Sequence, residues 1–485
     1  YAVLMLTRLI FFCFLQKQGS LAPTRPDALD GDPHYLRNHL PLMHTHADGD
    51  SFYRSFLLRL FHEGFGCPAG TREAFSKQSE ASKALFGKLP PMKSSLFAEH
   101  ELERAYSAIH IPDEAFARLF AFFEEFDWCV ESDSTRNERA ITPEVLGALF
   151  ASHANQKQRG SYYTEADIVA YISATTIIPS LFDAVQQQCP AAFTQHGPIW
   201  SLLRAHPERY MHSALRHGCA ITLPPEIEAG VQNISLRNSW NQAAPAVYAL
   251  PLETWREVFA RRQHYTSILA RLHAGTICTI DELITCNLDL CRFARDTIMC
   301  CNDGDLLTAF YTSLERVTIL DPTCGTGAFL LAALDILEPL YTACLTRMQQ
   351  LLAAHARGDD TACAKRDSTC TFCERFHALL RAVGESPSYQ YFIRKSILSR
   401  NLYGIDILPE AVECCKLRLF LALLAPVRAF AEIESLPALD FHVRVGNALV
   451  GFVASAELAA TGLLVASRHA ELDGALAVEY GIDVL

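Results

Sequence analysis

The chain has 485 residues, of which 50% are hydrophobic and 20% are charged, and its glycines and prolines are scattered along it. This composition is typical of a globular protein and excludes a low-complexity chain. The length predicts roughly three domains, and we place them at residues 1–150, 151–315 and 316–485. The formal net charge of -12 argues against a generally basic nucleic-acid-binding surface, so any contact with DNA must come from local basic patches or from a part of the protein outside this sequence.

The cysteines and the first residues indicate where the protein resides. The 17 cysteines have no regular spacing, which fits reduced thiols of a cytoplasmic protein better than a disulfide framework. Residues 2–15 are apolar but too short to span a bilayer, and Arg8 interrupts them. We therefore expect a core helix there and no membrane partner. Because the chain begins with Tyr1 rather than Met, we also expect it to be an internal piece of a longer product.

Residues 1–150 are predicted to form a mostly helical region. Residues 53–62 and 115–126 carry apolar side chains, many of them aromatic, at helical spacing. Such stripes are typical of helices that face a core. Residues 66–95 contain several glycines, prolines and serines, and we expect a connecting loop there.

Residues 151–315 are also predicted to be helical, and they lead into the third region. One predicted helix covers residues 252–272 and carries Arg256, Arg261 and Arg262 on a largely polar face. We interpret this face as solvated, with contact to nucleic-acid phosphates as the alternative.

The most informative stretch is residues 317–330, in which a buried strand leads into a glycine turn that opens a helix. Gly325 and Gly327 allow a sharp turn and a close approach to a ligand where a Cβ would collide, and Asp321 at the strand end can accept bonds from a cationic amine. A dinucleotide fingerprint would need a third glycine in place of Leu330, and a phosphate loop would need Gly-Lys-Ser/Thr after the turn. The stretch therefore predicts a nucleotide-cofactor site of another kind.

Two more strands are predicted further along the chain. Residues 328–351 predict a long helix, which is followed by a polar stretch to about residue 388. A second strand, turn and helix begin within residues 401–410, and residues 441–445 predict a third strand. Parallel strands joined by crossover helices predict a doubly wound α/β sheet.

The predicted strand ends carry polar side chains that should converge on one crevice, because ligands of such sheets bind beyond the carboxyl ends of the strands. The acid Asp406 suits a bidentate bond to ribose hydroxyls, and Asn447 suits the edge of an adenine lying between Ile405 and Ile407. With Asp321 they predict an adenosyl-based cofactor. The alternative is that each side chain only caps the helix that follows it.

At this point the sequence resembles a known family, the adenine-specific DNA methyltransferases. Asp-Pro-Thr-Cys-Gly-Thr-Gly-Ala-Phe-Leu at 321–330 is similar to their S-adenosylmethionine loop, and residues 402–420 are similar to their second motif. The resemblance implies a Rossmann-like methyltransferase sheet, of which only the first strands are present, preceded by a mostly α-helical region. It adds Pro322 and Cys324 to the expected cofactor contacts; we interpret Cys324 as a small loop filler rather than a nucleophile.

Upstream, Arg-Gly-Ser-Tyr-Tyr-Thr at 159–164 resembles the segment that precedes the glycine loop in members whose cofactor region comes first. The resemblance implies that Tyr163 and Thr164 approach the methionine end of the cofactor. Glu165 stands where the family usually has proline.

More narrowly, residues 141–147 and 446–451 resemble the large fused restriction-modification enzymes of the type IIG-like kind. In that family a nuclease comes first, and a catalytic Asn-Pro-Pro-Tyr loop and a target-recognition domain follow the third strand. The only proline pairs here are Pro90-Pro91 and Pro224-Pro225, each preceded by leucine. We therefore expect a chain truncated before the catalytic loop, and we nominate no catalytic residue.

The expected function is methyl transfer from S-adenosylmethionine to the amino group of adenine in double-stranded DNA, within a restriction-modification or phage-defence system. The missing catalytic and target-recognition region is the expected partner, as a separate chain. The alternative is a catalytically inactive cofactor-binding or partner-binding remnant or subunit. Methylation of RNA or protein is a third hypothesis, which the long-range order of the motifs disfavours.

Other cysteines and cations give weaker signals. The zinc-type residues Cys363, Cys370, Cys373 and His377 include only one close pair, so we predict free thiols and no metal. Cys414 and Cys415 are interpreted as core thiols. Lys157 and Arg159 fit either phosphate contacts or a solvated loop.

Overall fold

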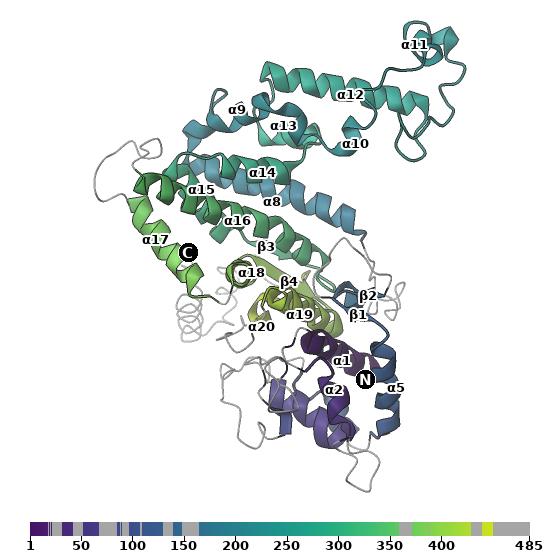
Figure 1. Ribbon diagram of the computed structural model, residues 1–485, viewed down its shortest axis with the longest axis vertical. Helices are drawn as coiled ribbons and strands as arrows, with labels where there is room; N and C mark the ends of the chain where they lie inside the picture. Colours follow the sequence, from purple (N-terminus) through teal and green to yellow (C-terminus); the bar gives the residue numbers. More distant parts are fainter. Residues whose placement is uncertain are drawn as a thin grey trace. The chain divides into compact units, whose positions relative to one another are not determined.

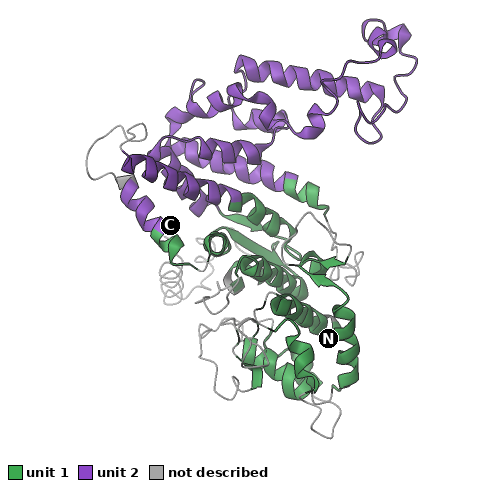
Figure 2. Cartoon of the chain, viewed as in Figure 1, with its two compact units in different colours: residues 1–170, 318–338, 381–485 green, residues 171–317, 339–380 purple. Residues whose placement is uncertain are grey.

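The computed structural model describes residues 1–17, 19, 21, 32–41, 52–66, 85–87, 89, 97–106, 109–129, 139–147, 164–357, 371–386, 388–427 and 439–449 (Figure 1). The chain forms two compact units (Figure 2). The first unit combines Tyr1–Ala170, Thr318–Glu338 and Arg381–Leu485, and the second combines Tyr171–Val317 and Pro339–Leu380.

The first unit contains a helical part built from residues near the amino terminus. Its helices are α1 (Ala2–Lys17), α2 (Tyr35–His39), α4 (Glu101–Ala105) and α5 (Asp113–Phe123), with two wider π-helical segments, η2 (Phe52–Leu57) and η3 (Leu60–Phe65). Both helices predicted within residues 1–150 are confirmed, although the first is wound with π geometry. The second ends at Phe123, where the indole N–H of Trp128 donates to the carbonyl of Phe123 at 2.8 Å.

Helix α1 is a core helix, as predicted. Its residues from Leu9 to Leu15 are at most 4% exposed, and Phe12 packs against Phe65 with ring centroids 5.0 Å apart. Arg8 is buried rather than solvated, because its Nη1 donates to Glu103 Oε1 at 2.7 Å. Burial alone would raise the pKa of Glu103, but bonds from His62, the backbone and Tyr1, together with the charge of Arg8, lower this pKa to about 2.

The first unit also holds a parallel sheet of three short strands in the order β3 (Ile319–Asp321), β4 (Leu402–Asp406) and β5 (Val443–Val445). Asp321 lies opposite Gly404, and Asp406 lies opposite Val445, so the strand ends share one edge of the sheet. A separate parallel pair joins β1 (Asp127–Trp128) to β2 (Ala140–Ile141). The described part is therefore mostly helical with a few short parallel strands, which is compatible with a partial α/β fold.

The second and third predicted strands are found, with one correction. Strand β4 and the helix α19 (Pro409–Leu424), which starts with proline in its first turn, match the prediction. The third strand begins only at Val443, because the preceding residues form the short helix α20 (Leu439–His442). His442 is held there through a 3.1 Å bond between its Nδ1 and the carbonyl of Leu402.

Helices α18 and α19 pack against β4, and α19 also packs against β5. Helix α16 (Ala328–Ala356) follows the glycine turn as predicted and continues from the first unit into the second, with Pro339 inside it. Helix α18 (Tyr389–Arg400) is fixed by Arg394, which donates to Glu338 at 2.9 Å and to the carbonyl of Ala422 at 2.6 Å. Helix α17 (Thr371–Gly384) occupies part of the polar stretch before residue 388.

The elements of the second unit are helices in its described part, as expected for residues 151–315; loops and two isolated antiparallel bridges, Met211 with Leu288 and Ala243 with Thr254, lie between them. Phe182, Trp200, Phe293 and Phe310 form its aromatic core; Phe293 stacks on Trp200 and on Phe182 with centroids 6.2 and 5.7 Å apart. The elements are α8 (Ala166–Gln188), which begins in the first unit, η5 (Pro190–Phe193), α9 (Pro198–Ala205), η6 (Pro207–Tyr210), α10 (Ser213–Arg216), α11 (Pro225–Gln232), η7 (Ile234–Leu236), α12 (Trp255–Ala274), α13 (Ile280–Thr285), α14 (Leu290–Met299) and α15 (Gly304–Arg316).

Helix α12 begins at Trp255 instead of Leu252. Thr254 is its N-cap, and Glu257 accepts bonds from the backbone and hydroxyl of Thr254 at 2.7 Å, which completes a capping box. The prediction of a solvated arginine face is wrong for Arg261, whose guanidinium forms two bonds with Glu253 at 2.8 and 2.9 Å.

Among the helices that the structure describes, α8 and α16 are long and apolar enough to cross a membrane by length and composition alone. This is weak evidence, because core helices of soluble proteins pass the same test. The protein buries 39% of the apolar stretch of α8 and 56% of that of α16.

Candidate functional site

The end of β3 presents a carboxylate with one unused oxygen. Asp321 Oδ1 accepts a bond from the backbone N–H of Thr323 at 3.0 Å. Its Oδ2 is buried and has no hydrogen-bond partner among the described residues. Burial and the nearby charge of Asp406 raise the pKa of Asp321, and the bond from Thr323 opposes them. A buried acceptor without a donor is unfavourable unless a ligand supplies one.

The end of β4 fastens the glycine turn to the sheet. Asp406 Oδ2 accepts a bond from the N–H of Gly325 at 2.9 Å, and Oδ1 accepts one from Leu408 at the same distance. The N–H of Cys324 donates to the carbonyl of Ile405 at 2.9 Å. Cys324 is 4% exposed, so it fills space inside the turn, as expected of a small loop residue.

The end of β5 lies next to β4. The N–H of Gly446 donates to the carbonyl of Asp406 at 2.9 Å, and the next residue, Asn447, is exposed. Ile407 is 62% exposed at the same end of the sheet, while Ile405 is half-buried. The structure thus brings the three predicted strand ends to one edge of the sheet.

The three polar side chains share a second property, which bears on the capping alternative. Each accepts a bond from the backbone N–H two residues further on, at 3.0 Å for Asp321, 2.9 Å for Asp406 and 3.0 Å for Asn447. Such local turns account for one oxygen of each side chain without any ligand. They do not account for Asp321 Oδ2, which keeps a free acceptor beside the loop.

The two positions of the turn require glycine for different structural reasons. Gly325 has φ of 51°, and a Cβ there would meet no atom within 4 Å, so only its backbone conformation favours glycine. Gly327 has φ of 87°, and its Cβ would lie 2.6 Å from the Sγ of Cys415 in α19. Within the protein, a side chain at Gly327 would therefore collide with Cys415.

Sequence reasoning did not single out Arg418, which supports the turn from behind. This side chain is 7% exposed and comes from α19, three residues after Cys415. Its Nη1 donates to the carbonyl of Thr326 at 2.8 Å, while its buried Nε has no partner among the described residues. A Cβ on Gly147 would lie 3.0 Å from Thr326 Oγ1, so residues near β2 pack on the same point. An arginine between Leu417 and Leu419, in the apolar second half of the helix, was the signal.

The remaining predicted residues have less structural support. Pro322 is exposed in the turn, and Thr164 is half-buried immediately before α8. Cys414 and Cys415 are buried, as predicted. In the part of the chain that the structure describes, no group of three or more residues has the types and placement for a metal ion. Cys373 and His377 lie on α17; the predicted residues Tyr163, Lys157, Arg159, Cys363 and Cys370 lie outside the described residues.

Comparisons with known proteins add one distant relative. The chain is 21% identical over 462 residues to a protein of Methanocaldococcus jannaschii whose name describes it provisionally as a type II restriction enzyme and methyltransferase. The alignment covers 93% of this chain and 27% of that protein, so the chain spans about a quarter of the relative's length. No family model and no solved structure matches the chain. The likeness supports a restriction-modification, methyltransferase-like class.

Proposed function

We propose that this chain is the cofactor-binding part of an adenine-specific DNA methyltransferase from a restriction-modification or phage-defence system. The observation that carries the proposal is the buried, unpartnered Oδ2 of Asp321 at the end of a parallel strand, beside the carboxylate of Asp406. The cofactor is S-adenosylmethionine, which supplies the methyl group. The substrate is double-stranded DNA, and the protein is cytoplasmic.

The residues present fit this cofactor by their chemistry. Asp321 Oδ2 is a free acceptor for a donor such as the ammonium group of the cofactor. Each oxygen of Asp406 accepts one backbone bond and keeps a second lone-pair site, so the side chain can still accept ribose hydroxyls. The exposed Ile407 and Asn447 provide an apolar contact and an amide for the adenine. Tyr163 and Thr164 approach the methionine end in this proposal.

Calorimetry with S-adenosylmethionine tests the proposal. Asp321→Asn keeps the oxygen that binds the Thr323 N–H and removes the negative charge. Hydrogen bonds to charged groups contribute about 1.5–3 kcal/mol, so we expect affinity to fall by roughly tenfold to a hundredfold. Glu410→Gln is the matched control, because it removes an exposed carboxylate from the first turn of α19. Equal affinity of wild type and Asp321→Asn would reject the proposed site.

A second candidate function is that of a non-catalytic cofactor-binding or partner-binding subunit. The local turns of Asp321, Asp406 and Asn447 favour it, because they give these side chains a structural role. The sequence also contains no Asn-Pro-Pro-Tyr run. Mixing this chain with one that carries such a loop, then following labelled methyl transfer to DNA, RNA and protein, separates the candidates. Transfer to DNA supports a split enzyme; no transfer to any polymer supports the inert subunit.

A further inference from the structure

The second unit carries a loop whose tip exposes a leucine in an unfavourable backbone conformation. The arm loop, which we define as residues 243–254, closes through an antiparallel bridge between Ala243 and Thr254, just before α12. Its ends are joined by a 3.0 Å bond from the N–H of Ala244 to the carbonyl of Glu253. All residues of the arm loop belong to the second unit.

The tip of the arm loop is a tight turn over residues 250–253. The N–H of Glu253 donates to the carbonyl of Leu250 at 3.1 Å, and Leu252 has φ of 68° after Pro251. This is the arrangement of a type II turn, in which glycine or asparagine is the usual residue at the third position. A leucine there is strained, and Leu252 is also 97% exposed. The backbone conformation costs stability, and the almost fully exposed side chain buries little surface within the described part that could offset this cost.

The arm loop is held firmly below this tip. Glu253 and Arg261 form a two-fold ion pair at 2.8 and 2.9 Å, and their side chains are only 12% and 10% exposed. Arg261 also donates to the carbonyl of Tyr248 at 2.9 Å, while Trp240 and Trp255 belong to a small core beneath the loop. Leu252 is therefore presented on a fixed support and not on a loose segment.

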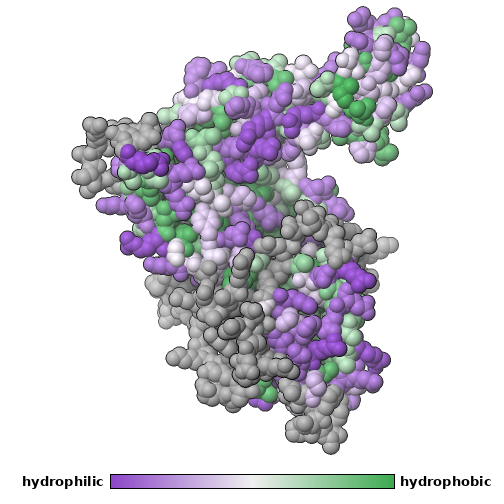
Figure 3. Space-filling model, viewed as in Figure 1, coloured by the Kyte–Doolittle hydropathy of each residue, from purple (hydrophilic) through white to green (hydrophobic). Residues whose placement is uncertain are grey.

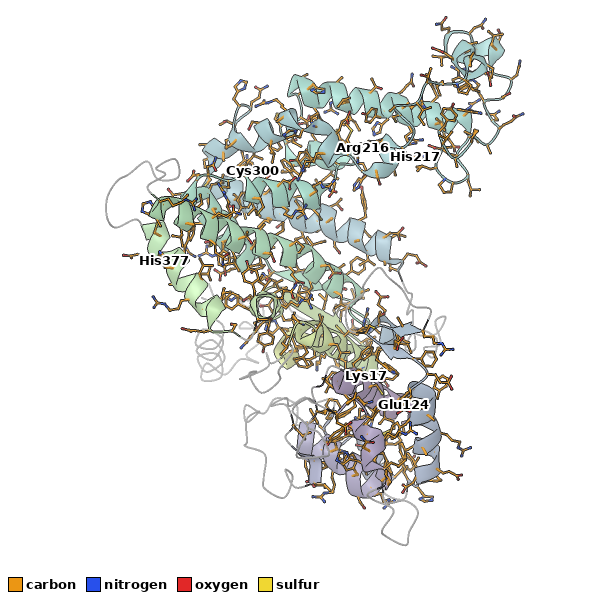
Figure 4. The ribbon with its side chains drawn as sticks, in the orientation of Figure 1. Lys17, Glu124, Arg216, His217, Cys300 and His377 are labelled. Atoms are coloured by element: carbon orange, nitrogen blue, oxygen red, sulfur yellow. The ribbon has the colours of Figure 1, made fainter. Side chains whose placement is uncertain are left out.

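Two exposed arginines, Arg216 and Arg256, lie near the arm loop. Arg216 and His217 are exposed at the end of α10, and His217 Nε2 lies 2.8 Å from the carbonyl oxygen of Ala246 (Figure 4). Arg256 is exposed in the first turn of α12. Glu253 is paired with Arg261, whereas Glu257 is exposed beside Arg256 and, among the described residues, bonds only to Thr254 in the capping box. Between residues 171 and 317 every lysine-or-arginine position is arginine. Arginine is the cation best suited to phosphate oxygens.

The apolar surface near the arm loop is small and divided. On the lobe that carries α11 and the adjoining end of α12, hydrophobic patches alternate with hydrophilic ones (Figure 3). The exposed apolar side chains of this part are Ile221, Ile234, Leu236, Val247 and Leu252. A protein interface of ordinary size needs about 800 Å² per partner, whereas kinking of DNA needs only one or two apolar side chains between base pairs and cations on the phosphates.

We propose that Leu252 is a wedge that inserts between base pairs of duplex DNA, with Arg216 and Arg256 on the flanking phosphates. This inference rests on the proposed function, which makes DNA the substrate. It adds a DNA-deforming contact on the helical unit, remote in sequence from the cofactor loop. The test must exclude that Leu252 instead contacts a second copy of this chain.

The test uses the full chain and a short duplex containing 2-aminopurine, whose fluorescence rises when a base pair unstacks. We expect Leu252→Gly to abolish that rise and to weaken duplex binding fivefold or more at every salt concentration. The same variant should unfold at an equal or higher temperature, because glycine relieves the positive φ. Arg216→Gln should instead reduce the salt dependence, since it removes one phosphate contact.

Ile234→Ser is the matched control, because Ile234 is 75% exposed on the same lobe. It should leave both the fluorescence rise and the affinity unchanged. Unchanged duplex binding and fluorescence in Leu252→Gly would overturn the proposal. A substitution that abolished only the self-association of the chain would overturn it as well. Cofactor calorimetry on the wild type and on Leu252→Gly keeps the two proposals separate. Failure of the wild type to bind cofactor rejects the proposed function, whereas loss of the fluorescence rise in Leu252→Gly still supports the wedge.

Discussion

The two glycines of the cofactor turn offer a matched pair of substitutions with different expected costs. At Gly325 a Cβ would meet no neighbour within 4 Å, so Gly325→Ala should cost only the left-handed backbone strain, about 1 kcal/mol. At Gly327 the same strain is joined by a contact of 2.6 Å with the Sγ of Cys415. Overpacking of a buried site costs about 1–3 kcal/mol, so we expect Gly327→Ala to lose about 3 kcal/mol in total.

The contact with Cys415 predicts a rescue. In the double variant Gly327→Ala with Cys415→Ala, the colliding sulfur is absent, and a double-mutant cycle should give a favourable coupling of about 1–2 kcal/mol. Urea unfolding should be followed at Trp128, the one tryptophan of the first unit, by fluorine NMR of fluorotryptophan-labelled protein. Equal losses for the two single variants, or no coupling with Cys415→Ala, would refute the packing argument.

Three further predictions concern buried charges. Arg418→Met should weaken cofactor binding more than Arg418→Lys does, because lysine can still donate to the carbonyl of Thr326. Calorimetry on both variants checks this prediction. Equal losses of affinity would contradict a positioning role for Arg418. The pKa of Glu103 is lowered from 4.5 to about 2, so its stabilisation, about 3 kcal/mol, is complete above pH 4.5 and is lost as the pH falls through about 2. Unfolding of Glu103→Gln should therefore depend less on pH in that range, and an unchanged profile would count against the buried network. Arg261→Met should lower the free energy of unfolding by about 3 kcal/mol, because it leaves the carboxylate of Glu253 without its cation. The double variant with Glu253→Gln should recover part of that loss in thermal unfolding. No recovery would contradict the ion pair.

The sequence predicted the local elements of the site well. The order of strand, acid, glycine turn and helix is written in consecutive residues, and β3, the start of α16, β4 and the proline at the start of α19 all appear where expected. The boundary errors have local causes. Helix α12 begins later than predicted because Thr254 is its N-cap, and β5 begins later because the preceding residues form α20.

Contacts between side chains of different segments were not predictable. Arg261 was expected to be solvated because it lies on a polar helical face, but Glu253 and the carbonyls of neighbouring segments bind it. Periodicity reports which face of a helix is polar; it does not report which groups another segment brings to that face.

By itself the sequence determined that acids and an amide follow the strands and that glycines follow the first acid, because these features depend on neighbouring residues and on the backbone conformations that each residue allows. The tertiary structure alone decided that Gly327 faces Cys415, that Arg418 holds the turn from behind and that Asp321 keeps a free oxygen. Those facts arise from packing between segments about 90 residues apart along the chain, for which only three-dimensional burial sets the partners.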